Sequence, residues 1–208
     1  MPSIGTILRP YGARAAGASA VLATDEVLLG PAWTDLRVIS SAKTGVGWVA
    51  PTMTKFQGGT PGIGLWAFNA TVENELLLTA QMPHNWRKGT NVIPHVHWTT
   101  NEDTSGDNGE TVIWGIEHVI GEVGGSFTSP ATVEATHTLD AVDKNNKSIV
   151  TGLAEIDMSA FTLSTILAMR LYRKALTDTW DKQAYLLEFD LHYQIDGLGS
   201  DEAFAKGF

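Results

Sequence analysis

The feature that most constrains the fold is the segment AYLLEFDLHYQI at residues 184–195, in which apolar and polar side chains alternate. One face would carry Tyr185, Leu187, Phe189, Leu191, Tyr193 and Ile195. The other face would carry Leu186, Glu188, Asp190, His192 and Gln194. Because successive side chains of a β-strand point to opposite faces, this period of two predicts a strand of an antiparallel sheet. Its apolar face would pack on a core, and its polar face would meet solvent or a partner.

Shorter segments in which apolar and polar residues alternate, separated by turn residues, predict further strands. They lie at residues 62–68, 74–83, 92–100, 111–123, 131–139, 147–158 and 164–175. The stretch GGTPGIG at 58–64 predicts a turn or bulge rather than a phosphate loop, since no Lys-Ser/Thr pair follows it. Helical signals are poor, and the best candidate is a short turn at 200–208 that Ser200 could cap.

Several short strands with regular turns indicate a β-sandwich or barrel. Two packed sheets in a jelly roll are one common way to manage the edges of such sheets. We therefore predict an all-β fold, a jelly-roll-like antiparallel β-sandwich over residues 31–208, with an extended N-terminal arm at 1–30. The arm segment is rich in Ala, Gly, Ser and Thr, and it would either dock on a neighbouring subunit or fray as an ordinary terminus.

Composition excludes several classes of function. The formal net charge is −9 and the pI about 5.0, so a bare phosphate backbone would repel the chain and we expect no nucleic-acid partner. There is no cysteine, which excludes disulfides, thiolate zinc sites and cysteine nucleophiles. No apolar run has the length of a signal-peptide core or a membrane helix. We expect a soluble protein that is made in the cytoplasm and has no membrane partner.

The stretch VIPHVHWTT at 92–100 holds two histidines one residue apart. On a strand, His95 and His97 share one face, while Val96 and Trp98 share the other. Two imidazoles so placed can chelate one metal ion, although such a pair is more commonly satisfied by neighbouring side chains or water. The pair is therefore a candidate metal site that the pattern alone does not establish.

The spacing of Gly89, His95, His97, Glu102 and Gly109 resembles the first motif of the cupin family. That resemblance implies iron, manganese or zinc ligands at His95, His97 and Glu102. The second cupin motif, built around Pro-x-Gly-x-x-His, is missing from the chain after residue 110. Nothing in the sequence marks a nucleophile with its base. We accordingly predict no catalytic residues, no cofactor and no bound metal, and keep the three ligands as the alternative.

The other histidines and the tryptophans have plainer interpretations. His84 follows a strand and is expected to make a turn hydrogen bond. His192 shares a strand face with Glu188 and Asp190, which predicts a polar outer face, with acid–base chemistry as the alternative. The seven tryptophans are spread along the chain and are expected in the core. Their alternative role is an aromatic platform for sugar rings or for a subunit interface.

Five segments of the chain carry a further resemblance: W-x-DLRV at 33–38, LWAFNATVENELLLTAQMPHNWRKGTNVIPHVHWTT at 65–100, VIWGIEHV at 112–119, MRLYRKA at 169–175 and LLEFDLHYQIDGLGSDE at 186–202. Together these segments resemble a family of tailed-bacteriophage structural proteins. The likeness covers most of residues 33–202, and PHVHW and EFDLHYQIDGLGS are its most distinctive parts. It implies a virion protein, an oligomeric β-sandwich attached to the capsid or tail, and no catalysis.

We therefore predict a non-enzymatic bacteriophage virion protein, in the first place a capsid decoration (cement) protein that stabilises the head. Its expected partners are itself, as a homotrimer or dimer, and the major capsid protein or other virion proteins. Two alternatives stay open: a cupin-like metal-binding enzyme that uses His95 and His97, and a tail receptor- or carbohydrate-binding module.

Overall fold

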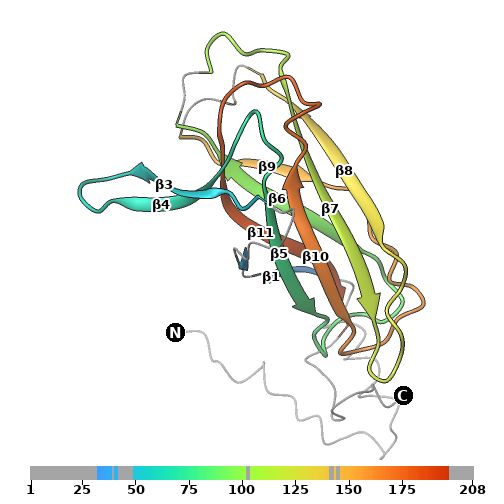
Figure 1. Ribbon diagram of the computed structural model, residues 1–208. Coiled ribbons are helices and arrows are strands. Elements are labelled where there is room, and N and C mark those ends of the chain that lie inside the picture. The colour runs from blue at the N-terminus through green and yellow to red at the C-terminus, as the bar shows by residue number, and fades with distance from the viewer. Residues whose placement is uncertain are drawn as a thin grey trace, which may run out of the picture.

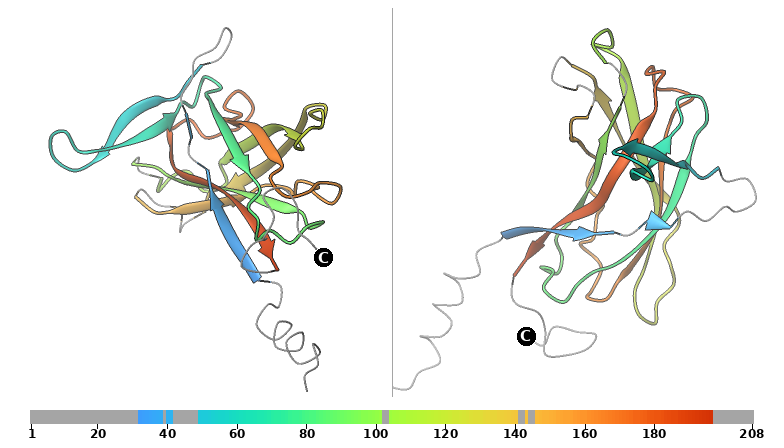
Figure 2. Two further views of the ribbon diagram at one scale, coloured as in Figure 1. Left: turned by 90° about the horizontal axis from the view of Figure 1, so that it is seen from below. Right: turned by 90° about the vertical axis from the view of Figure 1, so that its left-hand side faces the viewer.

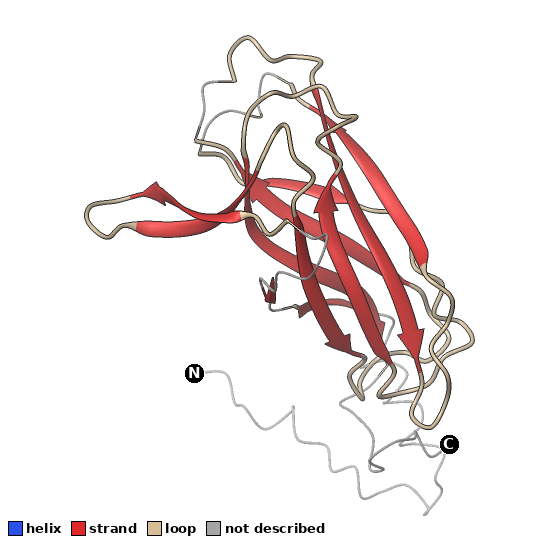
Figure 3. Cartoon of the chain, in the orientation of Figure 1, coloured by secondary structure: helices blue, strands red, loops and turns tan. Residues whose placement is uncertain are grey.

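The computed structural model describes residues 32–38, 40–41, 49–101, 104–140, 143 and 146–196. The regular elements of these residues are strands, and none of them is a helix (Figure 3). Their bounds are β1 (Ala32–Arg37), β2 (Ser40–Ser41), β3 (Thr52–Gln57), β4 (Ile63–Phe68), β5 (Glu75–Gln81), β6 (Val92–Thr99), β7 (Thr111–Gly121), β8 (Ala131–Thr138), β9 (Ile149–Gly152), β10 (Ile166–Arg173) and β11 (Ala184–Ile195). The arm predicted at 1–30 and the turn predicted at 200–208 lie outside the described residues.

The strands form two antiparallel sheets that pack face to face (Figure 1). The first sheet has the order β3-β4-β11-β6-β9, and β1 also pairs with β11. The second sheet has the order β2-β5-β10-β7-β8. Figure 2 shows β1 alongside the end of β11. Strands β4 and β1 share one edge of β11, β4 at residues 184–186 and β1 at residues 190–195.

The strand pairing is nested, and this makes the sandwich a jelly roll. Strand β7 pairs with β8, β6 with β9, β5 with β10, and β4 with β11, so the chain behaves as one long hairpin. Pairing of β6 with β11 and of β7 with β10 then joins these strand pairs into the two sheets. Consecutive strands from β4 to β7 alternate between the sheets, as they do in a double Greek key. The predicted fold class is confirmed.

The core lies between the inner faces of the two sheets, where period-two apolar residues meet. The largest apolar side chains that are almost fully removed from solvent are Trp86, Trp98, Trp114, Trp180, Phe68 and Phe189. Trp98 contacts both Trp114 and Trp180, with ring centroids 6.3 Å and 5.8 Å apart. The expectation that tryptophans fill the core is confirmed for these four. Trp66 is partly buried and packs against the core. Trp33 is an exception, with 47% of its surface exposed, and Trp48 lies outside the described residues.

The strict alternation predicted for residues 184–195 is broken by a β-bulge at Leu187. After the bulge, Phe189, Leu191 and Tyr193 face the core as predicted. Before it, the faces are exchanged, so Leu186 joins the core while Leu187 is 41% exposed. The prediction for Leu187 was therefore wrong, because an extra residue in one strand reverses the direction of every side chain beyond it. The bulge falls where the neighbour of β11 changes from β4 to β1.

Strands β3 and β4 form a hairpin that extends away from the sandwich in Figure 1 and in the left view of Figure 2. Its loop at residues 58–62 contains Gly58 and Gly62 with φ of +89° and +80°, so the turn predicted there is confirmed. Only the last residues of β4, Trp66 to Phe68, pair with β11. Strand β3 is the terminal strand in the described order of its sheet.

The strands predicted from the alternation correspond to β4 to β11. One is shorter than predicted: within residues 147–158, only Ile149–Gly152 is a strand, followed by an isolated bridge between Ile156 and Val92. Strands β1, β2 and β3 were not predicted. Their sequences lack a clean apolar face, and β1 and β3 are exposed at every second residue.

Candidate functional site

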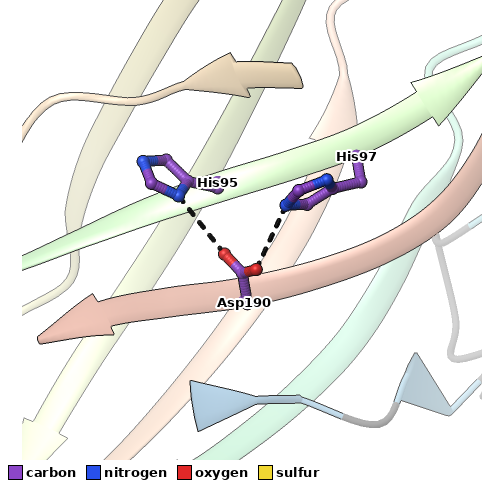
Figure 4. A group of neighbouring side chains, drawn as sticks. All are labelled: His95, His97 and Asp190. Atoms are coloured by element: carbon purple, nitrogen blue, oxygen red, sulfur yellow. Dashed lines mark hydrogen bonds and ion pairs between the residues drawn. The ribbon is translucent and has the colours of Figure 1, made fainter. Parts of the chain in front are cut away.

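His95 and His97 lie on β6 and point away from the core, as the alternation predicts. Val96 and Trp98 between and beside them are fully buried in the core. The two imidazoles thus project from the outer face of the first sheet (Figure 4). Their side chains keep 20% and 30% of their surface exposed.

Strand β11 brings Asp190 between the two histidines. The register pairs Asp190 with His95 and Glu188 with His97, so the carboxylate lies on the same outer face. His95 Nδ1 is 3.4 Å from Asp190 Oδ1, and His97 Nε2 is 3.1 Å from Asp190 Oδ2. Figure 4 shows both rings directed at this one carboxylate. A metal-binding atom of each of the three side chains lies within 4.8 Å of the other two.

Asp190 is only 5% exposed, which is unusual for a carboxylate on an outer face. His97 makes a hydrogen bond with Oδ2, whereas Oδ1 is buried and accepts no hydrogen bond from the residues that the structure describes. Burial lowers the pKa of His95, an effect that exceeds the opposing attraction of Asp190, and the nearby His192 and His97 add to the lowering. The His95 imidazole is therefore predominantly neutral at neutral pH.

The strands around this cluster place more charged side chains on the same face. His192 Nε2 is 3.0 Å from Asp35 Oδ1 on β1, and the His192 ring is 4.9 Å from that of His95. Arg37 Nε is 2.6 Å from Glu188 Oε1. The sheet face is thus polar, as predicted, and its charges are arranged in pairs between neighbouring strands.

Gly152 on β9 is the residue opposite His95 on its other side. A Cβ at this position would lie 3.4 Å from His95 Cδ2, so even an alanine would touch the ring. The backbone of β9 at Gly152 thus lies directly beside the His95 ring.

The candidate ligand Glu102 lies outside the described residues. The structure instead brings Asp190 to the histidine pair, from a strand that is distant in sequence. The signal that could have found it was the polar face of residues 184–195, but the sequence did not show that this face lies beside β6. The interior between the sheets is filled by the tryptophan cluster, and the imidazoles project outward from it.

The other histidines are separate from this cluster. His84 Nε2 is 3.2 Å from Ser164 Oγ, a side chain 80 residues away and not part of the local turn in which a hydrogen bond was predicted. His137 Nε2 is 2.7 Å from Asp143 Oδ2. His118 lies on β7 in the second sheet and is buried, and burial lowers its pKa. Within the described residues, the structure groups none of these three with a second histidine and a carboxylate.

The β3–β4 hairpin carries exposed apolar side chains. Met53 on β3 is 53% exposed and Ile63 on β4 is 61% exposed. Phe56 reaches back to the sandwich, with its ring 5.6 Å from that of Tyr185. The outer part of the hairpin therefore exposes one large apolar side chain on each of its two faces, Met53 on one and Ile63 on the other.

A hollow of about 610 Å³ lies at the end of the first sheet, beside Trp33. Its lining is mostly polar and comprises Trp33, Gly89, Thr90, Asn91, Glu155, Asp157, Ser159 and Gln194. Asn91 Nδ2 donates a hydrogen bond of 3.0 Å to Glu155 Oε2. The hollow combines one exposed indole with amide and carboxylate groups.

No family model matches the sequence, and no curated protein matches it. Among solved structures, the chain is similar to a protein of the infectious bursal disease virus Gx strain, with 14% identity, a TM-score of 0.37 and coverage of 85% of this chain and 34% of that one. It is also similar to TmCBM61, solved in complex with β-1,4-galactotriose, with 15% identity, a TM-score of 0.33 and coverage of 79% and 88%. The family 22 carbohydrate-binding module of Clostridium thermocellum Xyn10B has 11% identity, a TM-score of 0.28 and coverage of 79% and 86%.

The chain spans about a third of the length of the viral protein that it matches. All three TM-scores lie below 0.5, so these similarities give no argument for a function. Among the residues described, no helix has the length and apolar character required to cross a membrane.

Proposed function

We propose that this chain is a non-enzymatic structural protein of a bacteriophage virion, a capsid decoration (cement) protein that acts through its surfaces and assembles as a homodimer or homotrimer. The observation that carries the proposal is the β3–β4 hairpin, which extends from the sandwich and exposes Met53 and Ile63. A two-stranded hairpin is marginally stable by itself in water. A third strand or a packing surface from a partner would stabilise it.

The edge of the hairpin favours a second copy of this chain as that partner. Strand β3 pairs with β4 on one side, and its other side ends the described order of the sheet. Such an edge presents free backbone donors and acceptors that can pair with an equivalent strand. Met53 and Ile63 project from opposite faces of the hairpin, and a symmetric partner that covers the hairpin would remove them from solvent. The sequence resemblance to phage structural proteins points to the same role, and jelly rolls occur in viral capsid domains.

The proposal is tested by light scattering coupled to size exclusion on the full chain, followed by co-sedimentation with purified phage capsids. The double variant Met53→Lys/Ile63→Lys should shift the oligomer to a monomer and weaken binding to capsids. Leu176→Lys is the matched control, because Leu176 is 72% exposed but lies outside the hairpin. A monomeric wild-type protein with no affinity for capsids or tails would overturn the proposal.

A second candidate function is carbohydrate binding, and the exposed Trp33 beside the polar hollow favours it. An indole face can stack on a sugar ring, while amide and carboxylate groups such as those of Asn91 and Asp157 fix its hydroxyls. Calorimetric titration with a panel of oligosaccharides should then give binding that Trp33→Ala abolishes. A panel without any binding would remove this candidate and leave the assembly proposal unaffected.

A further inference from the structure

Three side chains from two neighbouring strands converge on the outer face of the first sheet, and the proposed assembly role does not use them. His95 and His97 come from β6, and Asp190 comes from β11. The distances of 3.4 Å and 3.1 Å between their ring nitrogens and the carboxylate oxygens are close to the roughly 3.3 Å that separates ligand atoms around a tetrahedral zinc ion.

The carboxylate itself gives the second observation. Asp190 is 95% removed from solvent, and its Oδ1 accepts no hydrogen bond from the described residues. A buried carboxylate oxygen that accepts no hydrogen bond is costly, and native structures generally satisfy such atoms with a hydrogen bond, a water molecule or an ion. This atom is on the side of Asp190 that faces His95. A cation held between the carboxylate and the two imidazoles would satisfy it.

We propose that His95, His97 and Asp190 bind one divalent transition-metal ion of the zinc class and thereby cross-link β6 to β11. Two imidazole nitrogens and one carboxylate oxygen form a donor set that suits such ions. Calcium and magnesium prefer oxygen donors and would bind poorly. Since both rings are partly exposed, a water molecule can complete the coordination.

This donor set differs from that of the cupin resemblance. The carboxylate is supplied by the neighbouring strand and not by the loop after β6, and the ion would lie outside the packed interior. The bound ion would link β6 to β11, whose residues His97 and Asp190 are 93 positions apart in the sequence. The inference does not depend on the virion role, because it concerns one chain and not its assembly.

The test is a titration of the metal-free full chain, prepared without a polyhistidine tag, with Zn²⁺ by calorimetry and with Co²⁺ by visible absorption. We expect one ion per chain, Co²⁺ bands of low coordination number, and no competition from millimolar Mg²⁺ or Ca²⁺. Asp190→Asn keeps the shape of the side chain and should weaken binding by at least about 10-fold, as should His95→Ala and His97→Ala. Circular dichroism of each variant verifies that it is folded.

His192→Gln is the matched control, because His192 adjoins His95 but pairs with Asp35 and lies outside the three-residue cluster. It should bind Zn²⁺ with an affinity within a few-fold of the wild type. Absence of Zn²⁺ and Co²⁺ binding in the wild type would overturn the proposal. Binding that persists undiminished in Asp190→Asn and in both histidine variants would also overturn it, since the ion would then be held elsewhere.

Discussion

Arg173 and Asp178 form an ion pair that is almost completely excluded from solvent. Their side chains are 0% and 1% exposed, and Arg173 Nε is 2.7 Å from Asp178 Oδ2. The guanidinium also donates to the backbone carbonyls of Trp180 and Lys182. The pair thus fixes the loop after β10 beside Trp180, through four hydrogen bonds from the three guanidinium nitrogens.

Removal of one partner from this pair should be strongly destabilising. Asp178→Asn leaves the Arg173 charge buried without its counter-ion, and we expect a loss of about 3–5 kcal/mol in the free energy of unfolding. Urea denaturation measures this loss. The control is Lys174→Met, which breaks the half-exposed pair with Glu134 and should cost at most about 1 kcal/mol. Equal losses in the two variants would contradict the expected effect of burial.

Gly115 should not tolerate a side chain, because Tyr172 lies directly over it. A Cβ at residue 115 would come within 2.4 Å of Tyr172 Cζ. We expect Gly115→Val to destabilise the fold by about 1–3 kcal/mol through displacement of the tyrosine. Thermal and urea unfolding of Gly115→Val, Tyr172→Ala and the double variant test the cause. If overlap with the ring is responsible, the double variant should lose less than the sum of the two single losses.

The hydrogen bond from Tyr172 should control the titration of Glu134. Tyr172 Oη donates to Glu134 Oε1 at 2.6 Å, and this bond is the largest cause of the lowered pKa of Glu134, ahead of the contribution of Lys174. Tyr172→Phe removes the donor, so the pKa of Glu134 should rise toward its ordinary value. Carboxyl carbon chemical shifts followed by NMR across the acidic range would show the rise. An unchanged pKa would mean that Lys174 alone accounts for the lowering.

His118 should make the protein less stable in mild acid. Burial lowers its pKa below the ordinary 6.5, and the residues paired with it, Met169 and Ala131, carry no charge. Below about pH 6.5 the unfolded chain therefore binds more protons at this position than the folded chain does. The contribution of neutral His118 to the free energy of unfolding is therefore fully present above about pH 6.5. It is lost as the pH falls toward the folded-state pKa.

Urea denaturation between about pH 8 and pH 5 measures this effect against the variant His118→Leu. The free energy of unfolding of the wild type minus that of the variant should decrease as the pH falls. His95 acts in the same direction in both proteins, because burial lowers its pKa too, so the difference between them isolates His118. A difference that is independent of pH would show that His118 is solvated in the folded protein.

The local features of the chain were largely predictable from its sequence. The alternation of apolar and polar side chains depends only on adjacent residues. It therefore predicted strands β4 to β11 and predicted that Val96 and Trp98 face away from His95. The bulge at Leu187 was not predictable in this way. It depends on which strands border β11, and both neighbours on that edge come from the first 70 residues of the chain.

The sequence by itself determined that this protein is a β-sandwich with outward-facing histidines, because alternation and turn residues act within a few positions. Only the tertiary structure decided that Asp190 lies between His95 and His97. That contact depends on β11 pairing with β6 in one register, and the register is selected by burying Phe189, Leu191 and Val96 in a common core. Since a slip of one residue would turn those side chains to solvent and the carboxylate inward, the packing of the core is what positions the candidate metal site.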